Sequence, residues 1–128
     1  MKTKKNRSIM QADNRHCFLC MELDQDDQRK YPLQCHHIFG GANRKLSDDD
    51  GLMVYLCWKH HGSFGPYDVH NTGANDYMDY LHVAGQLAWM KKVYGAKHPD
   101  ATEGKRAKAF VQRYGKNYIM DLADEDCP

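Results

Sequence analysis

Three short groups of cysteine and histidine residues supply side chains that commonly bind transition metals. These groups are Cys17-Phe-Leu-Cys20, Cys35-His36-His37 and Cys57-Trp-Lys-His60-His61. Two thiolates of a CxxC pair reach one metal from a single turn, and zinc completes its tetrahedron with two further cysteine or histidine ligands. The sequence therefore predicts a structural zinc site in which Cys17 and Cys20 form one half and Cys57 and His60 the other.

The second half of this zinc site leaves two alternatives open. His61 could replace His60, and Cys35 could replace Cys57. Because neighbouring helical residues point about 100° apart, His60 and His61 do not easily face the same ion. With His60 on the zinc, we expect His61 to face back across the chain toward the other histidines.

Three histidines, His36, His37 and His61, are left over by the zinc site. An imidazole with a pKa near its ordinary value of about 6.5 can accept a proton from water at neutral pH. A divalent cation held by few protein groups keeps positions open for phosphate oxygens, and imidazole ligands favour Mn²⁺, Ni²⁺ or Zn²⁺ more than an all-oxygen site does. The surplus histidines therefore favour an enzyme.

These residues must be positioned by a β-hairpin. Residues 31–39 and 52–57 have the apolar character of strands, and Gly40-Gly41 ends the first, which leaves a long loop between them. Residues 58–63 could form one helical turn. Consecutive strand residues point to opposite faces, so His36 and His37 serve one site only if the strand ends or bulges there. The alternative is that one of them packs inside and the other is exposed.

The second half of the chain is predicted to be helical. One helix runs from a cap at Thr72 or Asn75 to about Tyr94, where Gly95 stops it, and a shorter one runs from Thr102 to Gly115. We therefore predict a small α+β fold, with a treble-clef zinc core and additional C-terminal helices. Residues 1–15 are expected to form a flexible basic arm, 16–123 a single domain and 124–128 an acidic tail.

Residues 17–61, which contain CFLC, HHIFGGANRK and VYLCWKHH, resemble the HNH (His-Me finger, ββα-metal) nucleases, particularly the zinc-stapled versions of bacteria and phages. The resemblance implies that His36 and His61 bind a catalytic Mg²⁺ or Mn²⁺ and that His37 is the general base. The family usually carries an asparagine before the second strand, where this chain has Gly51-Leu52. Asn43 and Asn71 are the candidates to replace it.

Other residues could support such a site. His70 could be a further metal ligand or a phosphate contact, although an exposed loop position is the alternative. Asn43, Arg44 and Lys45 follow the Gly-Gly turn and could position a nucleic-acid backbone. Trp58 could stack on a base.

The composition of the chain limits the classes of protein to which it can belong. The chain has 128 residues, 41% of them hydrophobic, a formal charge of +1 and five cysteines. A domain of this size has a modest core, an odd cysteine count argues against a disulfide framework, and the balanced charge gives no global case for nucleic acid. No apolar run is long enough to cross a bilayer, so we expect a cytoplasmic protein of a bacterium or a phage-infected cell, as a monomer or homodimer.

Three functions remain as hypotheses. The first is a metal-dependent endonuclease that hydrolyses DNA and is encoded by a phage or prophage. The second is a zinc-stapled module that binds nucleic acid without chemistry, which the missing asparagine favours. The third is a protein-binding adaptor or inhibitor on the same scaffold, for which the acidic clusters would supply the surface.

Overall fold

The computed structural model describes residues 8–12, 15–63, 65–70 and 76–119. Much of the predicted basic arm, the predicted helix caps Thr72 and Asn75, the candidate Asn71 and the acidic tail lie outside these residues. The described chain is a small α+β fold, as predicted, built on a two-stranded hairpin.

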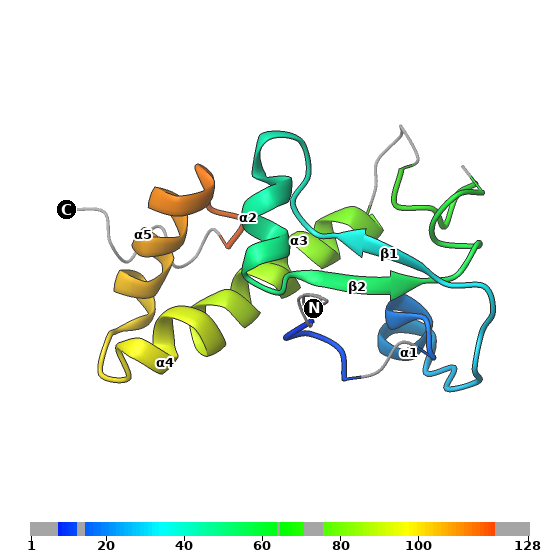
Figure 1. Cartoon of the computed structure of the whole chain (residues 1–128), viewed down its shortest axis with the longest axis horizontal. Coiled ribbons are helices and arrows are strands. Elements are labelled where there is room, and N and C mark those ends of the chain that lie inside the picture. Colours follow the sequence, from blue (N-terminus) through cyan, green and yellow to red (C-terminus); the bar gives the residue numbers. More distant parts are fainter. Residues whose placement is uncertain (1–7, 13–14, 64, 71–75, 120–128) are drawn as a thin grey trace, which may run out of the picture.

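The hairpin consists of β1 (Gln34–His37) and β2 (Met53–Leu56), which are antiparallel. Cys35 pairs with Tyr55 and His37 with Met53, so the pairing is regular up to the residue at which β1 ends. Both strands are shorter than the predicted segments. On the inner face Val54 and Leu56 are buried, and α3 runs behind the hairpin in Figure 1.

The connection between the strands contains two short helical elements in place of the predicted long loop. These are η1 (Gly41–Asn43) and α2 (Arg44–Asp49). Ser47 is fully buried at their centre, where its Oγ accepts a hydrogen bond from Phe39 N at 3.3 Å and donates one to Leu52 O at 2.6 Å. Because this hydroxyl links the two ends of the connection, it closes the hairpin around α2.

A third short helix, α1 (Phe18–Asp24), begins directly after Cys17, where only a single turn between Cys17 and Cys20 was expected. Phe18, Leu19 and Cys20 are buried on one side of it, and α1 lies beside β2 (Figure 1). Gln25 ends the helix in the left-handed conformation, with φ of 54°. Tertiary burial of the first turn therefore stabilises a helix that the sequence pattern did not indicate.

The second half is helical, as predicted, but its first helix continues past Tyr94, its predicted end. It consists of α3 (Asp76–Ala88), a stretch of π-helix η2 (Trp89–Tyr94) and α4 (Gly95–Lys97). Gly95 was wrongly predicted to stop the helix. It instead permits close packing, since a Cβ at this position would lie 2.6 Å from Arg106 Nη1 and 2.8 Å from Met90 O.

The last helix, α5 (Glu103–Tyr114), begins and ends where predicted. Thr102 Oγ1 accepts a hydrogen bond from Lys105 N at 3.1 Å, and Gly115 follows the helix with φ of 90°. Both are signals that can be identified in a sequence, because a hydroxyl satisfies an unpaired amide and glycine tolerates the left-handed conformation.

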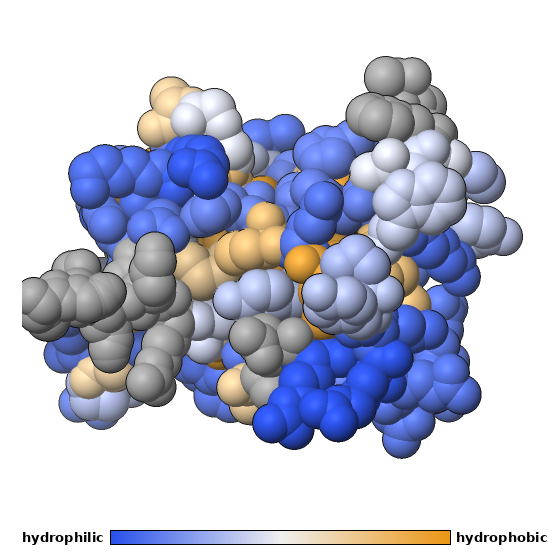
Figure 2. Space-filling model, turned by 45° about the vertical axis from the view of Figure 1, so that its right-hand side comes forward, coloured by the Kyte–Doolittle hydropathy of each residue, from blue (hydrophilic) through white to orange (hydrophobic). Residues whose placement is uncertain are grey.

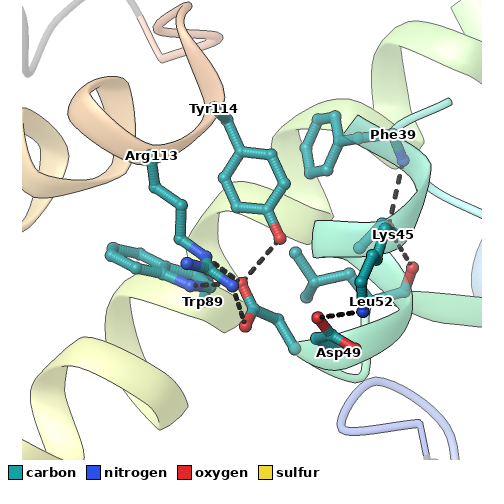
Figure 3. Close-up of polar contacts among 9 residues, drawn as sticks. Phe39, Lys45, Asp49, Leu52, Trp89, Arg113 and Tyr114 are labelled. Atoms are coloured by element: carbon teal, nitrogen blue, oxygen red, sulfur yellow. Dashed lines mark hydrogen bonds and ion pairs between the residues drawn. The ribbon is translucent and has the colours of Figure 1, made fainter. Parts of the chain in front are cut away.

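One carboxylate joins α5 to the hairpin connection. Asp50 accepts hydrogen bonds from Arg113 Nε at 2.7 Å, from the Tyr114 hydroxyl at 2.7 Å and from Trp89 Nε1 at 2.9 Å. Figure 3 shows these three side chains converging from α5 and η2. Charge-assisted hydrogen bonds on a side chain that is only 10% exposed fix the helical half against the hairpin.

The surface of the fold is largely polar. Figure 2 shows one face, on which hydrophilic side chains surround a short band of apolar ones. In the part of the chain that the structure describes, every helix is too short or too polar to cross a membrane.

Candidate metal centres

Three cysteines gather where α1 begins and β2 ends. The sulfur atoms of Cys17, Cys20 and Cys57 all lie within 4.8 Å of one another, and Cys20 Sγ is 3.7 Å from Cys57 Sγ. With a Zn–S bond of about 2.3 Å, two sulfurs of a tetrahedral site are about 3.8 Å apart. The spacing is therefore that of ligands around one tetrahedral ion, and this cysteine cluster could hold a metal.

The protonation of the three thiols points the same way. Burial raises the pKa of Cys17 and of Cys20. Burial also raises the pKa of Cys57, but hydrogen bonds, led by the one from Cys17, outweigh it and lower that pKa overall. Of the three thiols, Cys57 is therefore the first to ionise, and a bound cation would stabilise all three as thiolates.

The structure places His60 beside this cluster. His60 is 1% exposed, and one of its ring nitrogens lies within 4.8 Å of Cys20 Sγ and of an Asp24 oxygen. Its Nδ1–H donates to Tyr67 O at 2.7 Å, so Nε2 carries the lone pair, and Nε2 is buried without a hydrogen-bond partner among the described residues. An unpaired buried nitrogen costs about 1–3 kcal/mol, which a metal bond would offset.

Cys35, the alternative to Cys57, lies elsewhere. It is exposed on β1 and is not one of the three clustered cysteines. Strand alternation turns Cys35 to the open face of the hairpin, away from the three clustered cysteines.

A second cluster is formed by His36, His61 and His70, which come from β1, from the turn after β2 and from the segment before α3. Their ring centroids are 4.9–5.6 Å apart, and Nε2 of His61 lies 3.3 Å from Nε2 of His70. His36 Nε2 is buried and has no hydrogen-bond partner in the described part of the chain. The structure thus places His70, which was predicted as a possible further ligand, beside the two other predicted ligands.

The loop that carries His61 and His70 is held by Asp68, which is fully buried. Its two carboxylate oxygens accept hydrogen bonds from Gly62 N and from His70 N, each at 2.7 Å. Gln34 Oε1 accepts a hydrogen bond from His61 Nδ1–H at 2.5 Å, so His61 Nε2 carries the lone pair. Outer hydrogen bonds of this kind fix the ring orientation of a metal-binding histidine.

The electrostatics of this histidine cluster favour the neutral form of His36 and of His61. Burial, followed by the charges of His61 and His70, lowers the pKa of His36 to about 3. Burial, followed by the charge of His70, lowers the pKa of His61. At a metal–nitrogen distance of about 2.0–2.1 Å, tetrahedral ligand atoms are about 3.3–3.4 Å apart, which matches the His61–His70 separation. The histidine cluster could therefore hold a metal ion.

His37 points away from its neighbour, as strand alternation predicts. Its Nε2–H donates to Asp48 Oδ1 of α2 at 2.9 Å, and its side chain is 13% exposed. It nevertheless lines the same hollow as the histidine cluster, a space of about 290 Å³. The end of β1, without a bulge in the pairing, is sufficient to place both residues on this hollow.

The three residues predicted to bind nucleic acid differ in their surroundings. Asn43 Nδ2 donates to Tyr114 O at 3.0 Å, which engages its amide in the fold. Lys45 pairs with Asp49 at 3.3 Å on the surface, as Figure 3 shows. Arg44 is exposed at the edge of the hollow. Of the three, Arg44 lies nearest in the fold to the histidine cluster.

Sequence reasoning missed three residues of the site, Gln34, Asp48 and Asp68. Gln34 and Asp48 have partners 27 and 11 positions away, so no local pattern pairs them. Asp68 bonds Gly62, six positions before it, as well as His70, two positions after it. Asp48 was visible only as a member of an acidic run, Asp48-Asp49-Asp50, whose three carboxylates have different partners.

The chain was compared with models of protein families, with curated proteins and with solved structures, and none of the three comparisons found a match.

Proposed function

We propose that this chain is a metal-dependent endonuclease of the HNH, or His-Me finger, type that hydrolyses DNA phosphodiester bonds. The observation that carries the proposal is the histidine cluster, which opens onto a hollow that His37 also lines. A module that only binds nucleic acid needs one structural metal. A second donor set without thiols, next to a histidine paired with a carboxylate, fits catalysis better.

In this proposal the cysteine cluster and His60 hold a structural zinc at the centre of a treble-clef, ββα-metal core. Structural zinc sites are closed and use four protein ligands, whereas catalytic sites keep a position open. The buried sulfurs and the unpaired Nε2 of His60 suit the first kind. The half-exposed His61 and exposed His70 suit the second.

The histidine cluster is the proposed catalytic centre. A divalent ion bound by His36, His61 and His70 would supply the positive charge that phosphodiester hydrolysis requires. Because the donors are imidazoles, the site would favour Mn²⁺, Ni²⁺ or Zn²⁺ over Mg²⁺. Gln34 holds the His61 imidazole in place, and Asp68 holds the backbone of the loop that carries His61 and His70.

His37 is the proposed general base. Since its Nε2–H is donated to Asp48, its Nδ1 carries the lone pair that would accept a proton from water. The Asp48 carboxylate would stabilise the imidazolium that results. Asp48 thus takes the orienting role of the family's asparagine, for which the engaged amide of Asn43 is poorly suited.

A plasmid-nicking assay with Mg²⁺, Mn²⁺, Ni²⁺ and Zn²⁺ tests the proposal. We expect nicking by the parent protein and a loss of about 10²–10⁴-fold in His37→Ala, the usual contribution of a general base. His98→Ala, an exposed histidine outside both clusters, is the matched control and should cut normally. Equal nicking by His37→Ala and the parent, at unchanged zinc content, would exclude His37 as the base.

A further inference from the structure

Two hollows adjoin β1 and meet at its edge. The smaller one contains the histidine cluster. The larger one, about 830 Å³, lies on the open face of the hairpin and is called here the Tyr55 hollow. Cys35, His37 and Arg44 line both hollows. A ligand bound at the histidine cluster can therefore extend past His37 into the Tyr55 hollow without leaving the protein surface.

The sheet supplies the floor of the Tyr55 hollow. Cys35 pairs with Tyr55 and His37 with Met53, so alternation projects these side chains from one face. Met53 is buried, whereas the Tyr55 ring is half-buried. An aromatic ring that is supported below and open above is a surface on which a base can stack.

The connection between the strands supplies the cationic wall. Lys45 lies on this wall, and its ion pair with Asp49 is exposed and hence weak. The side chain of Arg44 is exposed and makes no hydrogen bond or ion pair with another described residue, so its guanidinium is available to an anion. Asp48, the acidic residue of the lining, is already hydrogen-bonded to His37. Cations beside a stacking surface match a phosphate joined to a base.

The size of the Tyr55 hollow favours a single nucleotide over a duplex as its ligand. A volume of about 830 Å³ lies in the range of about 300–1,000 Å³ typical of small-molecule sites. It would admit a nucleotide but not a duplex. A paired base keeps both faces stacked on its neighbours, so it reaches a pocket only when it is unpaired or flipped out.

We propose that the Tyr55 hollow binds an unpaired nucleotide next to the phosphate that is cut, so that the preferred substrate is DNA with a single-stranded or bulged nucleotide at the cleavage site. This inference rests on the proposed nuclease function. It goes further in naming the substrate class and Tyr55 as the residue that recognises it.

Binding is measured first, so that the hollow is tested separately from cleavage. Fluorescence anisotropy compares a labelled eight-residue oligothymidylate with a fully paired duplex, in metal-replete protein carrying His37→Ala to prevent cutting. Tyr55→Leu, added to this background, should weaken oligothymidylate binding about fivefold or more, as loss of one stacked base does. Tyr55→Phe keeps the ring and should bind like its parent. Equal binding by the Leu and Phe variants, tighter binding of duplex, or no binding of oligothymidylate would overturn the inference.

If the zinc content of Tyr55→Leu shows that this variant does not fold, a second variant, Arg44→Gln, tests the same hollow. It should weaken oligothymidylate binding and lower the salt dependence by about one phosphate contact. An unchanged salt dependence would count against the inference.

Cleavage is scored separately with Mn²⁺, on a duplex and on the same duplex with one bulged nucleotide. The parent should cut the bulged duplex at least tenfold faster, and equal rates would overturn the inference while leaving the nuclease function in place. If neither duplex is cut, the proposed function fails. The claim of a substrate preference then falls with it, and Tyr55-dependent binding would show a binding site only.

Discussion

The two clusters of this small fold that could hold a metal ion differ in what surrounds them. The cysteine cluster has three buried or half-buried sulfurs and lies against α1 and the core. In the histidine cluster His36 is buried, His61 is half-buried and His70 is exposed, and the cluster opens onto a hollow. A closed thiolate site suits stability and an open imidazole site suits chemistry, so burial and ligand type together support the different functions proposed for the two clusters.

The largest effect is expected from breaking the cysteine cluster. Cys57→Ser should release the metal and unfold the domain, because structural zinc sites contribute about 10–16 kcal/mol of binding energy against a total stability of about 5–15 kcal/mol. Circular dichroism and metal analysis measure both changes. Cys35→Ser, an exposed cysteine outside the cluster, should remain folded. A folded, metal-replete Cys57→Ser protein would show that the cluster is not a structural site.

Breaking the histidine cluster should abolish nicking but leave the domain folded. His61→Ala should reduce plasmid nicking by more than about 100-fold, since an ion held by two imidazoles binds more weakly and less precisely. The thermal midpoint should stay within a few degrees of the parent, because His61 is only half-buried. Unfolding of His61→Ala together with loss of the thiolate-bound metal would mean that the two clusters form one structural unit.

Only the parts of the two clusters that depend on local spacing could be predicted from the sequence. The spacings of Cys17-Cys20 and Cys57-His60 are local, and so are the cap and stop of α5. The sequence alone could not pair Gln34 with His61 or Asp48 with His37, because these contacts depend on how α2 and the loop after β2 pack. The missed helices α1 and α2 are short, and tertiary burial, at Leu19 and Ser47 for example, stabilises them more than their propensity does.

A smaller effect should distinguish two adjacent carboxylates. Asp48→Asn keeps an oxygen near His37 but removes the charge that stabilises the imidazolium, so nicking should fall about tenfold and its rise with pH should shift. Asp49→Asn is the matched control, because Asp49 pairs only with the exposed Lys45 among the described residues. Equal rates and pH profiles for the two variants would remove Asp48 from the mechanism.

The smallest effect concerns stability in acid. The pKa of His36 is about 3 in the folded chain and about 6.5 when unfolded, so below pH 6.5 the unfolded state binds more protons. The free energy of unfolding should therefore decrease as the pH is lowered below 6.5, and His36 should contribute about 1.4 kcal/mol per pH unit to this decrease. Above pH 6.5 His36 should have no effect on the pH dependence. Denaturant unfolding measured from pH 5 to 8 gives the free energy of unfolding as a function of pH. The slope of this free energy against pH should be shallower for His36→Gln than for His98→Gln. Identical slopes would contradict the burial of a neutral His36.

The division between the two clusters is tested most directly by removing metal stepwise with a chelator while following metal content, fold and nicking in one sample. We predict that nicking disappears first, while about one metal per chain and the circular dichroism spectrum persist, and that added Mn²⁺ restores nicking. Simultaneous loss of nicking, bound metal and fold would contradict the assignment of structure to the cysteine cluster and chemistry to the histidine cluster.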